Sequence, residues 1–287
     1  MSPADRVKQI TRQITFPKGL LIGQVAIITG SGQGIGAETA RLFANEGAKV
    51  VVQDIDTKRA EDVAQGIRDS GGEAIAVPGD MLDFAYIPKL VQEAAKFGNG
   101  KIHIIVNNAG FTWDSVIHKM TDEAWKTIID LHCTAPFMLV RAAAPYFRVA
   151  DGERRCIINI SSVSGIHGNA GQANYSLAKA GVTGLTKTIA KEWGPKYGVR
   201  SITVAFGYIK GTRLSGSKEA GNFAVTPDGK RVAIGVPQAI RSERDAKNDV
   251  PLGRPGKVPE AAAAIMAAAS PLFDYITGET LMVTGGK

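Results

Sequence analysis

A short apolar run near the start of the chain leads directly into a glycine-rich turn, and this junction restricts the fold more than any other feature. Residues 25–29 are typical of a buried strand; Gly30, Gly34 and Gly36 follow, with a helix-like segment at 37–46. Glycines let a backbone approach phosphate groups, and a helix start offers free N–H groups and a positive dipole end. The junction therefore predicts a pyrophosphate site, although its spacing, G-x-x-x-G-x-G, differs from the usual G-x-G-x-x-G.

Apolar runs and helix-like segments alternate along most of the remaining chain. Helices are predicted at 86–97, within 122–149 on both sides of Pro136, and around Tyr175. The further predicted strands are 49–53, 74–77, 102–106, 156–160, 200–205 and 280–283. This alternation predicts the α/β class: a Rossmann-like, doubly wound parallel sheet with helices on both faces. At 287 residues and 44% hydrophobic, the chain has enough core for a single domain of this kind.

Composition excludes several classes of partner. No apolar run reaches the roughly 18 residues of a membrane-spanning helix, so we expect no membrane. The net charge of +7 is spread along the sequence, which favours a solvated surface over a nucleic-acid partner. Cys133 and Cys156 provide neither a disulfide framework nor a metal site, so a reducing compartment is expected. We expect a cytoplasmic protein, with the mitochondrion or another organelle as the alternative.

Two segments lie outside the regular alternation. Residues 1–24 form a basic N-terminal extension ahead of the domain at 25–287, and an arm that packs on the body or on a partner subunit is favoured over a transit peptide because serine is scarce. The segment of about 208–249 is rich in glycine and charge. Within it, the turn at 226–230 predicts a small hairpin.

Tyr175 and Lys179 are four residues apart in a helix-like segment, which places both side chains on one helix face. An ordinary tyrosine, with a pKa near 10, is a poor acid or base at neutral pH. A lysine charge about 4 Å away is worth roughly three pKa units, so we expect Lys179 to bring the pKa of Tyr175 close to working pH. Ser162 adds a hydroxyl that can hold a substrate oxygen. The alternative is a surface tyrosine beside a solvated lysine.

Asp54 ends the second predicted strand, 18 residues beyond Gly36. An acid at about this distance accepts hydrogen bonds from the adenosine ribose and repels a 2′-phosphate. The glycine turn contains no Arg or Lys, so the sequence favours NAD(H). NADP(H) is the alternative, because Lys58 and Arg59 follow Asp54 closely. A helix cap or turn residue is the purely structural interpretation of Asp54.

Several features follow predicted strands and should meet at the carboxyl edge of the sheet, where such folds bind ligands. They are the glycine turn, Asp54, Asp80, Asn107, Ser162 and Phe206-Gly207. With these motifs in this order, the chain resembles the short-chain dehydrogenase/reductase family from about residue 22 to 286. The resemblance is carried by Thr29-Gly30-x-x-x-Gly34-x-Gly36, the Asn-Asn-Ala-Gly of 107–110, Ser162 and Tyr175-x-x-x-Lys179. The segments 168–175, 251–254 and 275–281 are similar to 3-oxoacyl-thioester reductases.

The resemblance implies a role for each matching residue. Tyr175 would exchange a proton with the substrate oxygen, Lys179 would hold the nicotinamide ribose, and Ser162 would orient the substrate. Substrate contacts are implied for Ser162, Gln172 and Tyr175, and the segment of about 208–249 is implied to cover the substrate. The resemblance implies no metal. Cofactor contacts are expected from Thr29, Gly30, Ser31, Gln33, Gly34, Ile35, Gly36, Asp54, Ile55, Asp80, Met81, Asn107, Ala109, Gly110, Tyr175, Lys179, Gly207 and Ile209.

Three positions depart from the family pattern. His132 stands where the family usually has an asparagine; a neutral histidine can donate and accept, so we include it among the catalytic residues as holder of a relay water, with simple packing as the alternative. Phe206 replaces the usual proline before Gly207, which is expected to loosen the backbone there. Thr212 is displaced by one residue from the usual threonine.

These features together predict an NAD(P)-dependent oxidoreductase that interconverts a carbonyl and a secondary alcohol by hydride transfer. The expected substrate is 3-oxoacyl-like, such as a thioester of coenzyme A or acyl carrier protein. One alternative is a dehydrogenase of another alcohol or ketone: a secondary metabolite, a steroid or a polyol. Another is a non-redox protein that binds a dinucleotide on the same fold. The resemblance also implies a homotetramer.

Overall fold

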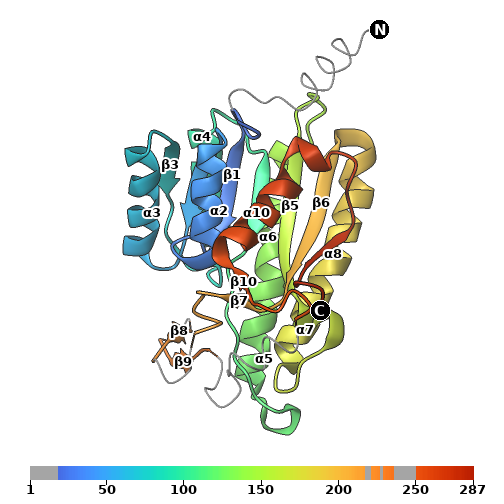
Figure 1. The fold of residues 1–287 in the computed structure, drawn as a ribbon. Coiled ribbons are helices and arrows are strands. Elements are labelled where there is room, and N and C mark those ends of the chain that lie inside the picture. Colours follow the sequence, from blue (N-terminus) through green and yellow to red (C-terminus); the bar gives the residue numbers. More distant parts are fainter. Residues whose placement is uncertain (1–18, 217–220, 227–228, 236–249) are drawn as a thin grey trace.

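The computed structural model describes residues 19–216, 221–226, 229–235 and 250–287, which build one parallel sheet between two layers of helices (Figure 1). The strand order is β11-β6-β5-β4-β1-β2-β3, and every neighbouring pair is parallel. The predicted fold class is confirmed. The strands are β1 (Val25–Thr29), β2 (Lys49–Gln53), β3 (Glu73–Ala76), β4 (Ile104–Asn107), β5 (Arg155–Ser162), β6 (Val199–Phe206) and β11 (Thr280–Val283).

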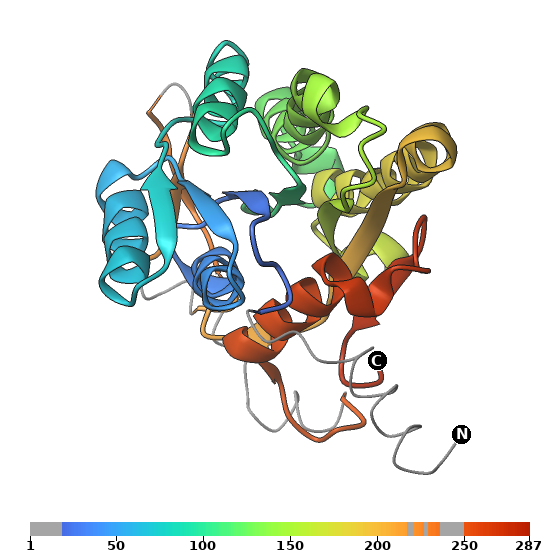
Figure 2. The same ribbon diagram turned by 90° about the horizontal axis from the view of Figure 1, so that it is seen from above.

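The strands are apolar on both faces because helices cover both faces (Figure 2). Ile28 packs into the layer formed with α2, α3 and α10, whereas its neighbour Ile27 packs into the layer of α4, α6 and α8. The helices are α2 (Gly34–Asn45), α3 (Thr57–Asp69), α4 (Tyr86–Phe97), α5 (Asp122–Ile129), α6 (Ala135–Phe147), α7 (Val163–His167), α8 (Ala173–Tyr197) and α10 (Val258–Ala269).

The helical segment around Pro136 differs from the prediction of two separate helices. A π-helical segment, Asp130–Thr134, joins α5 to α6 without a break. Pro136 lies in the first turn of α6, and because the helical backbone is continuous there, its missing N–H removes one backbone hydrogen bond at the junction. The wider π turn changes the direction of the side chains it carries, and His132 is one of them.

The segment after β6 returns to the body of the protein and then forms a hairpin. The strands β7 (Ile209–Lys210) and β10 (Gly256–Lys257) pair in parallel. β8 (Phe223–Val225) and β9 (Arg231–Ala233) pair antiparallel, so the predicted hairpin is confirmed. Lys230 fastens this hairpin, since its ammonium lies 2.9 Å from a Glu123 carboxylate oxygen and 4.8 Å from the centre of the Trp113 ring. Residues 217–220, 227–228 and 236–249 of the predicted substrate loop lie outside the described residues.

Most of the predicted N-terminal extension, residues 1–18, also lies outside the described residues. The described remainder packs on the body: Leu21 is fully buried and its N–H donates to the carbonyl of Glu46 at 2.9 Å. Among the described residues, no helix combines the length and apolar character needed to cross a membrane.

Candidate active site

The glycine turn after β1 forms a cradle that side chains would fill. A Cβ on Gly30 would lie 2.7 Å from the Cα of Ala109, and one on Gly36 would collide with the carbonyl oxygen of Gly30. Helix α2 begins directly after Gln33, whose side-chain oxygen accepts a hydrogen bond from Arg59 at 2.7 Å rather than capping the helix. The first N–H groups of α2 are therefore uncapped by Gln33, in the arrangement that binds phosphate groups.

Two hydroxyl side chains hold this turn in place. The Ser31 hydroxyl is fully buried; it donates to the Ile28 carbonyl at 2.6 Å and accepts from the Gln53 N–H. The Thr29 hydroxyl accepts from the N–H groups of Asn108 and Ala109, both at 3.0 Å. The structure thus places the side chains of Ser31 and Thr29 in the frame of the turn. Their predicted cofactor contacts remain predictions.

Asn108 stands inside the Asn-Asn-Ala-Gly motif but is absent from the predicted contacts. Its side-chain amide donates to the carbonyls of Thr29 and Gly30, at 2.9 and 3.1 Å, and thereby ties the glycine turn to the end of β4. Its neighbour Asn107 is buried and donates to Asn159 at 2.8 Å. The motif itself is the signal that could have included Asn108, because asparagine side chains in turns commonly hydrogen-bond to backbone groups.

Asp54 lies at the end of β2 with its carboxylate fixed by backbone. One oxygen accepts from the N–H of Gly32 at 2.9 Å and the other from the N–H of Asp56 at 3.0 Å. Only 6% of the residue is exposed. The adjoining predicted contacts lie along the same edge: Ile55 follows β2 with 54% exposure, and Asp80 follows β3. Burial raises the pKa of Asp80.

Met81 is buried beside Asp80, whereas Ala109 and Gly110 follow Asn107 at the end of β4. Of these, Gly110 is exposed, and the ring of His132 occupies the space where a side chain at position 110 would begin. The structure therefore brings the predicted cofactor residues of β1, β2, β3 and β4 to one edge of the sheet.

Tyr175 and Lys179 lie on one face of α8, next to the end of β5. The Lys179 ammonium is 5.5 Å from the centre of the Tyr175 ring and donates to the Ile160 carbonyl at 2.7 Å. Both residues are buried, at 8% and 4% exposure. Ser162 ends β5, and its hydroxyl also accepts from the Ser164 N–H at 3.2 Å, which caps α7. The predicted triad is thus brought together.

The prediction for the pKa of Tyr175 is wrong. Burial of the phenol raises that pKa to about 12; a hydrogen bond with Ser162 lowers it in part, and the charge of Asp114 raises it again. Burial also lowers the pKa of Lys179 to about 8. Desolvation disfavours a phenolate, and here it outweighs the attraction of the nearby lysine. Tyr175 is therefore a protonated group at neutral pH, suited to donate a proton.

His132 lies against the tyrosine, in the π-helical segment. Its ring meets that of Tyr175 edge to face, with centres 5.1 Å apart, and its Nε2 lies 2.8 Å from the carbonyl oxygen of Phe111. Because a carbonyl only accepts, Nε2 carries the hydrogen and Nδ1 presents a lone pair. Burial, followed by the charge of Lys179, lowers the pKa of His132 well below its ordinary value. Nδ1 is buried and has no hydrogen-bond partner among the described residues.

Gln172, a predicted substrate contact, has its side-chain oxygen and one N–H group bonded to protein groups. Its amide nitrogen donates to both carboxylate oxygens of Asp114, each at 3.2 Å. Its amide oxygen accepts from Ser164 and Asn169, both at 3.0 Å. The two oxygens of one carboxylate lie too close together for both N–H groups of an amide, so a single N–H is shared between them. The predicted substrate contact of Gln172 remains a prediction. Asp114 was absent from the prediction, since its contact depends on a pairing 58 residues away.

The segment after β6 is held despite the loss of proline. The Gly207 N–H donates to the Val283 carbonyl at 3.0 Å, and the Gly256 N–H donates to the Tyr208 carbonyl at the same distance. Ile209 is buried within the β7–β10 pair. The displaced Thr212 exchanges hydrogen bonds with Ser215. Hydrogen bonds to β11 and β10 thus supply the restraint that was expected to disappear with the proline.

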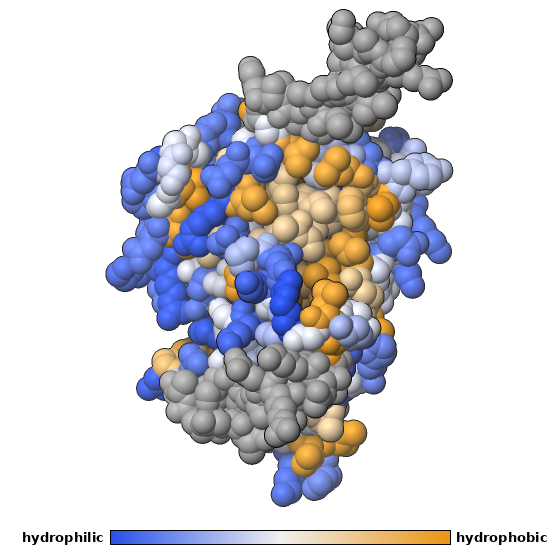
Figure 3. Space-filling view, in the orientation of Figure 1, coloured by the Kyte–Doolittle hydropathy of each residue, from blue (hydrophilic) through white to orange (hydrophobic). Residues whose placement is uncertain are grey.

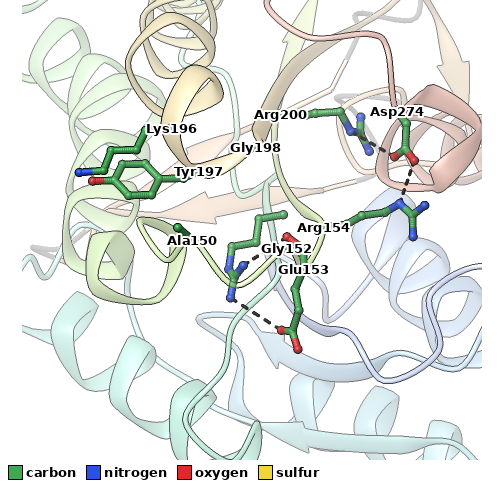
Figure 4. Close-up of a pocket in the computed structure, with 10 residues that line it drawn as sticks. Ala150, Gly152, Glu153, Arg154, Lys196, Tyr197, Gly198, Arg200 and Asp274 are labelled. Atoms are coloured by element: carbon green, nitrogen blue, oxygen red, sulfur yellow. Dashed lines mark hydrogen bonds and ion pairs between the residues drawn. The ribbon is translucent and has the colours of Figure 1, made fainter.

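A cavity of about 390 Å³ lies away from these residues, at the amino ends of β5 and β6 (Figure 4). Arg155 and Arg200 line it and are both buried. Arg155 binds both oxygens of Asp151 at 2.6 and 2.7 Å, while Arg200 donates to carbonyls at the end of α10 and approaches Asp274. These groups satisfy one another, so we assign the cavity to the structural framework.

Comparisons with known proteins agree with this geometry. A family model described as short chain dehydrogenase matches residues 24–222. The chain is 38% identical to a 3-oxoacyl-(acyl-carrier-protein) reductase of Synechocystis over 93% of this chain and 97% of that protein. It is 37% identical to such a reductase of Vibrio cholerae, over 93% of this chain and 98% of the relative. It is also 42% identical to a peroxisomal multifunctional enzyme type 2 of Drosophila melanogaster, over 59% of this chain and 29% of that enzyme.

Proposed function

The chain belongs to the short-chain dehydrogenase family and is an oxidoreductase of carbonyl and alcohol groups; from this premise we propose that its substrate is a 3-oxoacyl thioester. The observation that carries the proposal is the assembled triad of Ser162, Tyr175 and Lys179 in a chain that matches 3-oxoacyl reductases along nearly its full length. We retain 25–287 as the catalytic domain and 1–24 as an extension.

The residues at the carboxyl edge fit a nicotinamide dinucleotide. The cradle at Gly30 and Gly36 has no room for a side chain, and the start of α2 offers backbone N–H groups to a pyrophosphate. Asp54, Ile55 and Asp80 would hold the adenosine end, while Asn107, Ala109, Gly110, Gly207 and Ile209 would line the remainder. When bound, the nicotinamide supplies or accepts the hydride.

Tyr175 is the proposed proton donor to the carbonyl oxygen. Its pKa of about 12 keeps the phenol protonated at neutral pH, and Ser162 lies within hydrogen-bond reach of the same hydroxyl. Negative charge that develops on a reduced carbonyl oxygen would be met by these two hydroxyl groups. In the reverse direction the same phenol oxygen would take the proton from an alcohol.

Lys179 and His132 are proposed to support this transfer. Lys179 donates one of its three N–H groups to the Ile160 carbonyl, so two donors remain for the nicotinamide ribose. His132 is held neutral, and its Nδ1 lone pair is buried close to Lys179. A water that accepts from Lys179 and donates to Nδ1 would give that nitrogen the partner it needs.

We propose a preference for NAD(H) because the Asp54 carboxylate cannot turn away without breaking its hydrogen bonds to Gly32 and Asp56. A 2′-phosphate would therefore meet a fixed negative charge. Arg59 and Arg213 lie on the same side and favour the opposite choice, but Arg59 is already bonded to Asp56 and Gln33.

Cofactor binding and turnover test the proposal directly. Calorimetry should give tighter binding of NADH than of NADPH, and addition of an acetoacetyl thioester should lower absorbance at 340 nm. Tighter binding of NADPH would overturn the role of Asp54 alone. Binding of a cofactor without thioester reduction would remove the proposed substrate while leaving the oxidoreductase site in place.

We further propose a homotetramer in a reducing, cytoplasmic compartment. Apolar side chains gather on the face over α10 (Figure 3). Leu272, Ile276 and Met282, which follow α10 in the sequence, are exposed. Exposed apolar side chains also stand on α5 and α6, at Trp125 and Phe137. Two such surfaces on one chain suit an assembly with two kinds of interface. Light scattering during gel filtration would reveal a mass near four chains.

A further inference from the structure

The segment that follows β6 crosses the carboxyl edge of the sheet. A hydrogen bond to β11 holds its start, and Figure 1 shows the β8–β9 hairpin, to which it leads, on the half of the molecule that carries α2 and α3. In the sheet, β6 and β2 lie on opposite sides of β1. A segment that runs from β6 to the side of β2 therefore passes over the glycine turn that follows β1.

Arg213 lies in this segment, near the end of β2. Burial and the charge of Arg59 lower the pKa of its guanidinium, whereas the charge of Asp54 raises that pKa. Such effects of charge are strong only at short range. The guanidinium is therefore close to the first turn of α3 and to the carboxylate that we expect to hold the adenosine ribose. Arg213 is absent from the cofactor contacts expected from the sequence.

The guanidinium of Arg213 has few protein partners. Its Nη1 donates to the carbonyl of Phe223, in β8, at 3.2 Å. Within the part of the chain that the structure describes, it makes no second hydrogen bond and no ion pair. A guanidinium carries five N–H donors, so most of them are available to a ligand or to water on this half-buried side chain. A single carbonyl thus orients Arg213 without using up its capacity to bind.

The cofactor cradle provides backbone N–H groups but no cationic side chain of its own, because the glycine turn and the first turn of α2 contain no Arg or Lys. The neighbouring Arg59 is engaged, since it donates to Gln33 at 2.7 Å and pairs with Asp56 at 3.2 Å. The carboxylate of Asp54 is fixed in the same place. A diphosphate here brings negative charge toward a fixed carboxylate, and Arg213 is placed to offset the repulsion.

We propose that Arg213 is a cofactor-binding residue that donates hydrogen bonds to the diphosphate of the dinucleotide, from the side opposite the glycine turn. The inference rests on the proposed function, because it concerns the dinucleotide proposed there. A planar guanidinium suits two phosphate oxygens at once. Phe223 is the positioning residue: its carbonyl orients Arg213, and the guanidinium of Arg231 covers its ring at 3.4 Å.

Calorimetry on the full chain measures the binding of adenosine, ADP, NADH and NADPH. Arg213→Met should weaken the binding of ADP and of NADH by about tenfold, because charged hydrogen bonds to phosphate are lost, and should leave adenosine binding unchanged. Arg213→Lys keeps the charge without the planar fork, so its loss should be smaller. Arg231→Met is the matched control, since it removes an exposed arginine of the adjoining hairpin and should not alter ADP binding.

The inference is overturned if Arg213→Met binds ADP as tightly as the unaltered protein does. A loss confined to NADPH would place the guanidinium at the 2′-phosphate and would overturn it as well. Should the variant fail to fold, phenylglyoxal modification of the unaltered protein replaces it: ADP should protect Arg213 and adenosine should not, whereas equal modification with both would contradict the inference.

Failure of the proposed function looks different. A protein that binds dinucleotide but does not reduce the thioester loses its proposed substrate, and the ADP measurements still decide the role of Arg213. An unaltered protein that binds neither ADP nor a dinucleotide would overturn the proposed cofactor site and this inference together.

Discussion

Arg155 and Lys179 are cations buried to the same depth, at 3% and 4% exposure, but at opposite ends of β5 and its neighbours. Arg155, at the amino end, donates to both oxygens of Asp151 and to the carbonyls of Tyr146 and Glu153. Lys179, at the carboxyl end, donates to a single carbonyl, that of Ile160, and has no carboxylate partner among the described residues.

This difference separates two uses of buried charge. A buried cation whose donors are all matched by protein groups contributes to cohesion, and removing it leaves its partners unpaired. A buried cation with unused donors carries a desolvation cost, visible in the lowered pKa of Lys179, and is available to a ligand. The buried charge at the amino edge of the sheet therefore serves stability, whereas the carboxyl edge is where we propose that catalysis takes place.

The largest test of this division is Tyr175→Phe. The variant keeps the ring that packs on His132 and removes the hydroxyl that we assign as proton donor to the substrate, so kcat should fall by about 10³ or more. Cofactor binding measured by calorimetry should stay nearly unchanged. Turnover within tenfold of the unaltered protein would contradict the acid–base role of the phenol.

Arg155→Met tests the other edge. We expect the free energy of unfolding to fall by about 3 kcal/mol, the lower end for breaking a buried pair, because the side chain of Asp151 is 30% exposed. Denaturant titration measures the loss. Arg154→Met is the control, since its guanidinium is 55% exposed and its pair with Asp274 should be worth less than about 1 kcal/mol. Equal losses in both variants would remove the distinction between matched and surface charges.

His132→Ala tests whether the histidine beside Tyr175, at the carboxyl edge, has a role in proton transfer. If Nδ1 takes part in a relay, the rate should fall about tenfold and the pH–rate profile should change, because a positioned proton-transfer partner is lost. His118→Ala, an exposed position, is the control. A folded His132→Ala variant with an unaltered rate and profile would leave the histidine with a packing role only.

Lowering the pH should gradually reduce the free energy of unfolding through titratable groups at the amino edge of the sheet. Hydrogen bonds from Arg155 lower the pKa of Asp151, and those from Lys101 and His103 lower the pKa of Glu153, so their stabilisation is present at neutral pH and lost as pH falls below their ordinary values of 3.8 and 4.5. Burial lowers the pKa of His103, so the unfolded chain binds a proton near pH 6.5 before the folded chain does. Stability should therefore decline from pH 6.5 downward.

Denaturant titrations between pH 7 and pH 4 would measure this decline. Glu153→Gln should make the decline below pH 6.5 steeper, because the hydrogen bond and charge of Glu153 raise the pKa of His103 and their loss lowers that pKa further. A free energy of unfolding that stays level or increases toward pH 4 would show that Asp151, Glu153 and His103 do not determine how stability depends on pH in acid.

Local patterns were sufficient to predict the sheet and the glycine turn. The strand at 25–29, the turn at Gly30 and the helix at 86–97 depend on periodicity and backbone freedom, which neighbouring residues determine, and each was found where expected. The π-helical segment at Asp130–Thr134 was not predicted, because a single extra residue in a helical turn leaves the apolar pattern nearly unchanged.

Those properties of the site that depend on tertiary packing could not be predicted from the sequence. The spacing of Tyr175 and Lys179 predicted their proximity but not the burial that raises the tyrosine pKa. The Asp114–Gln172 pair joins positions far apart in sequence, and the buried role of Ser31 depends on two strands meeting beneath the turn. Contacts of this kind become visible only when the chain is folded.

The ring of His132 occupies the space where a side chain at position 110 would begin. The two positions therefore constrain the order in which this lineage could change. Any larger residue at Gly110 would have to arrive after His132 had been replaced by something smaller, whereas a change at 132 is open at any time. Stepwise libraries should consequently yield active variants when position 132 is changed first and position 110 second. The reverse order should not yield them.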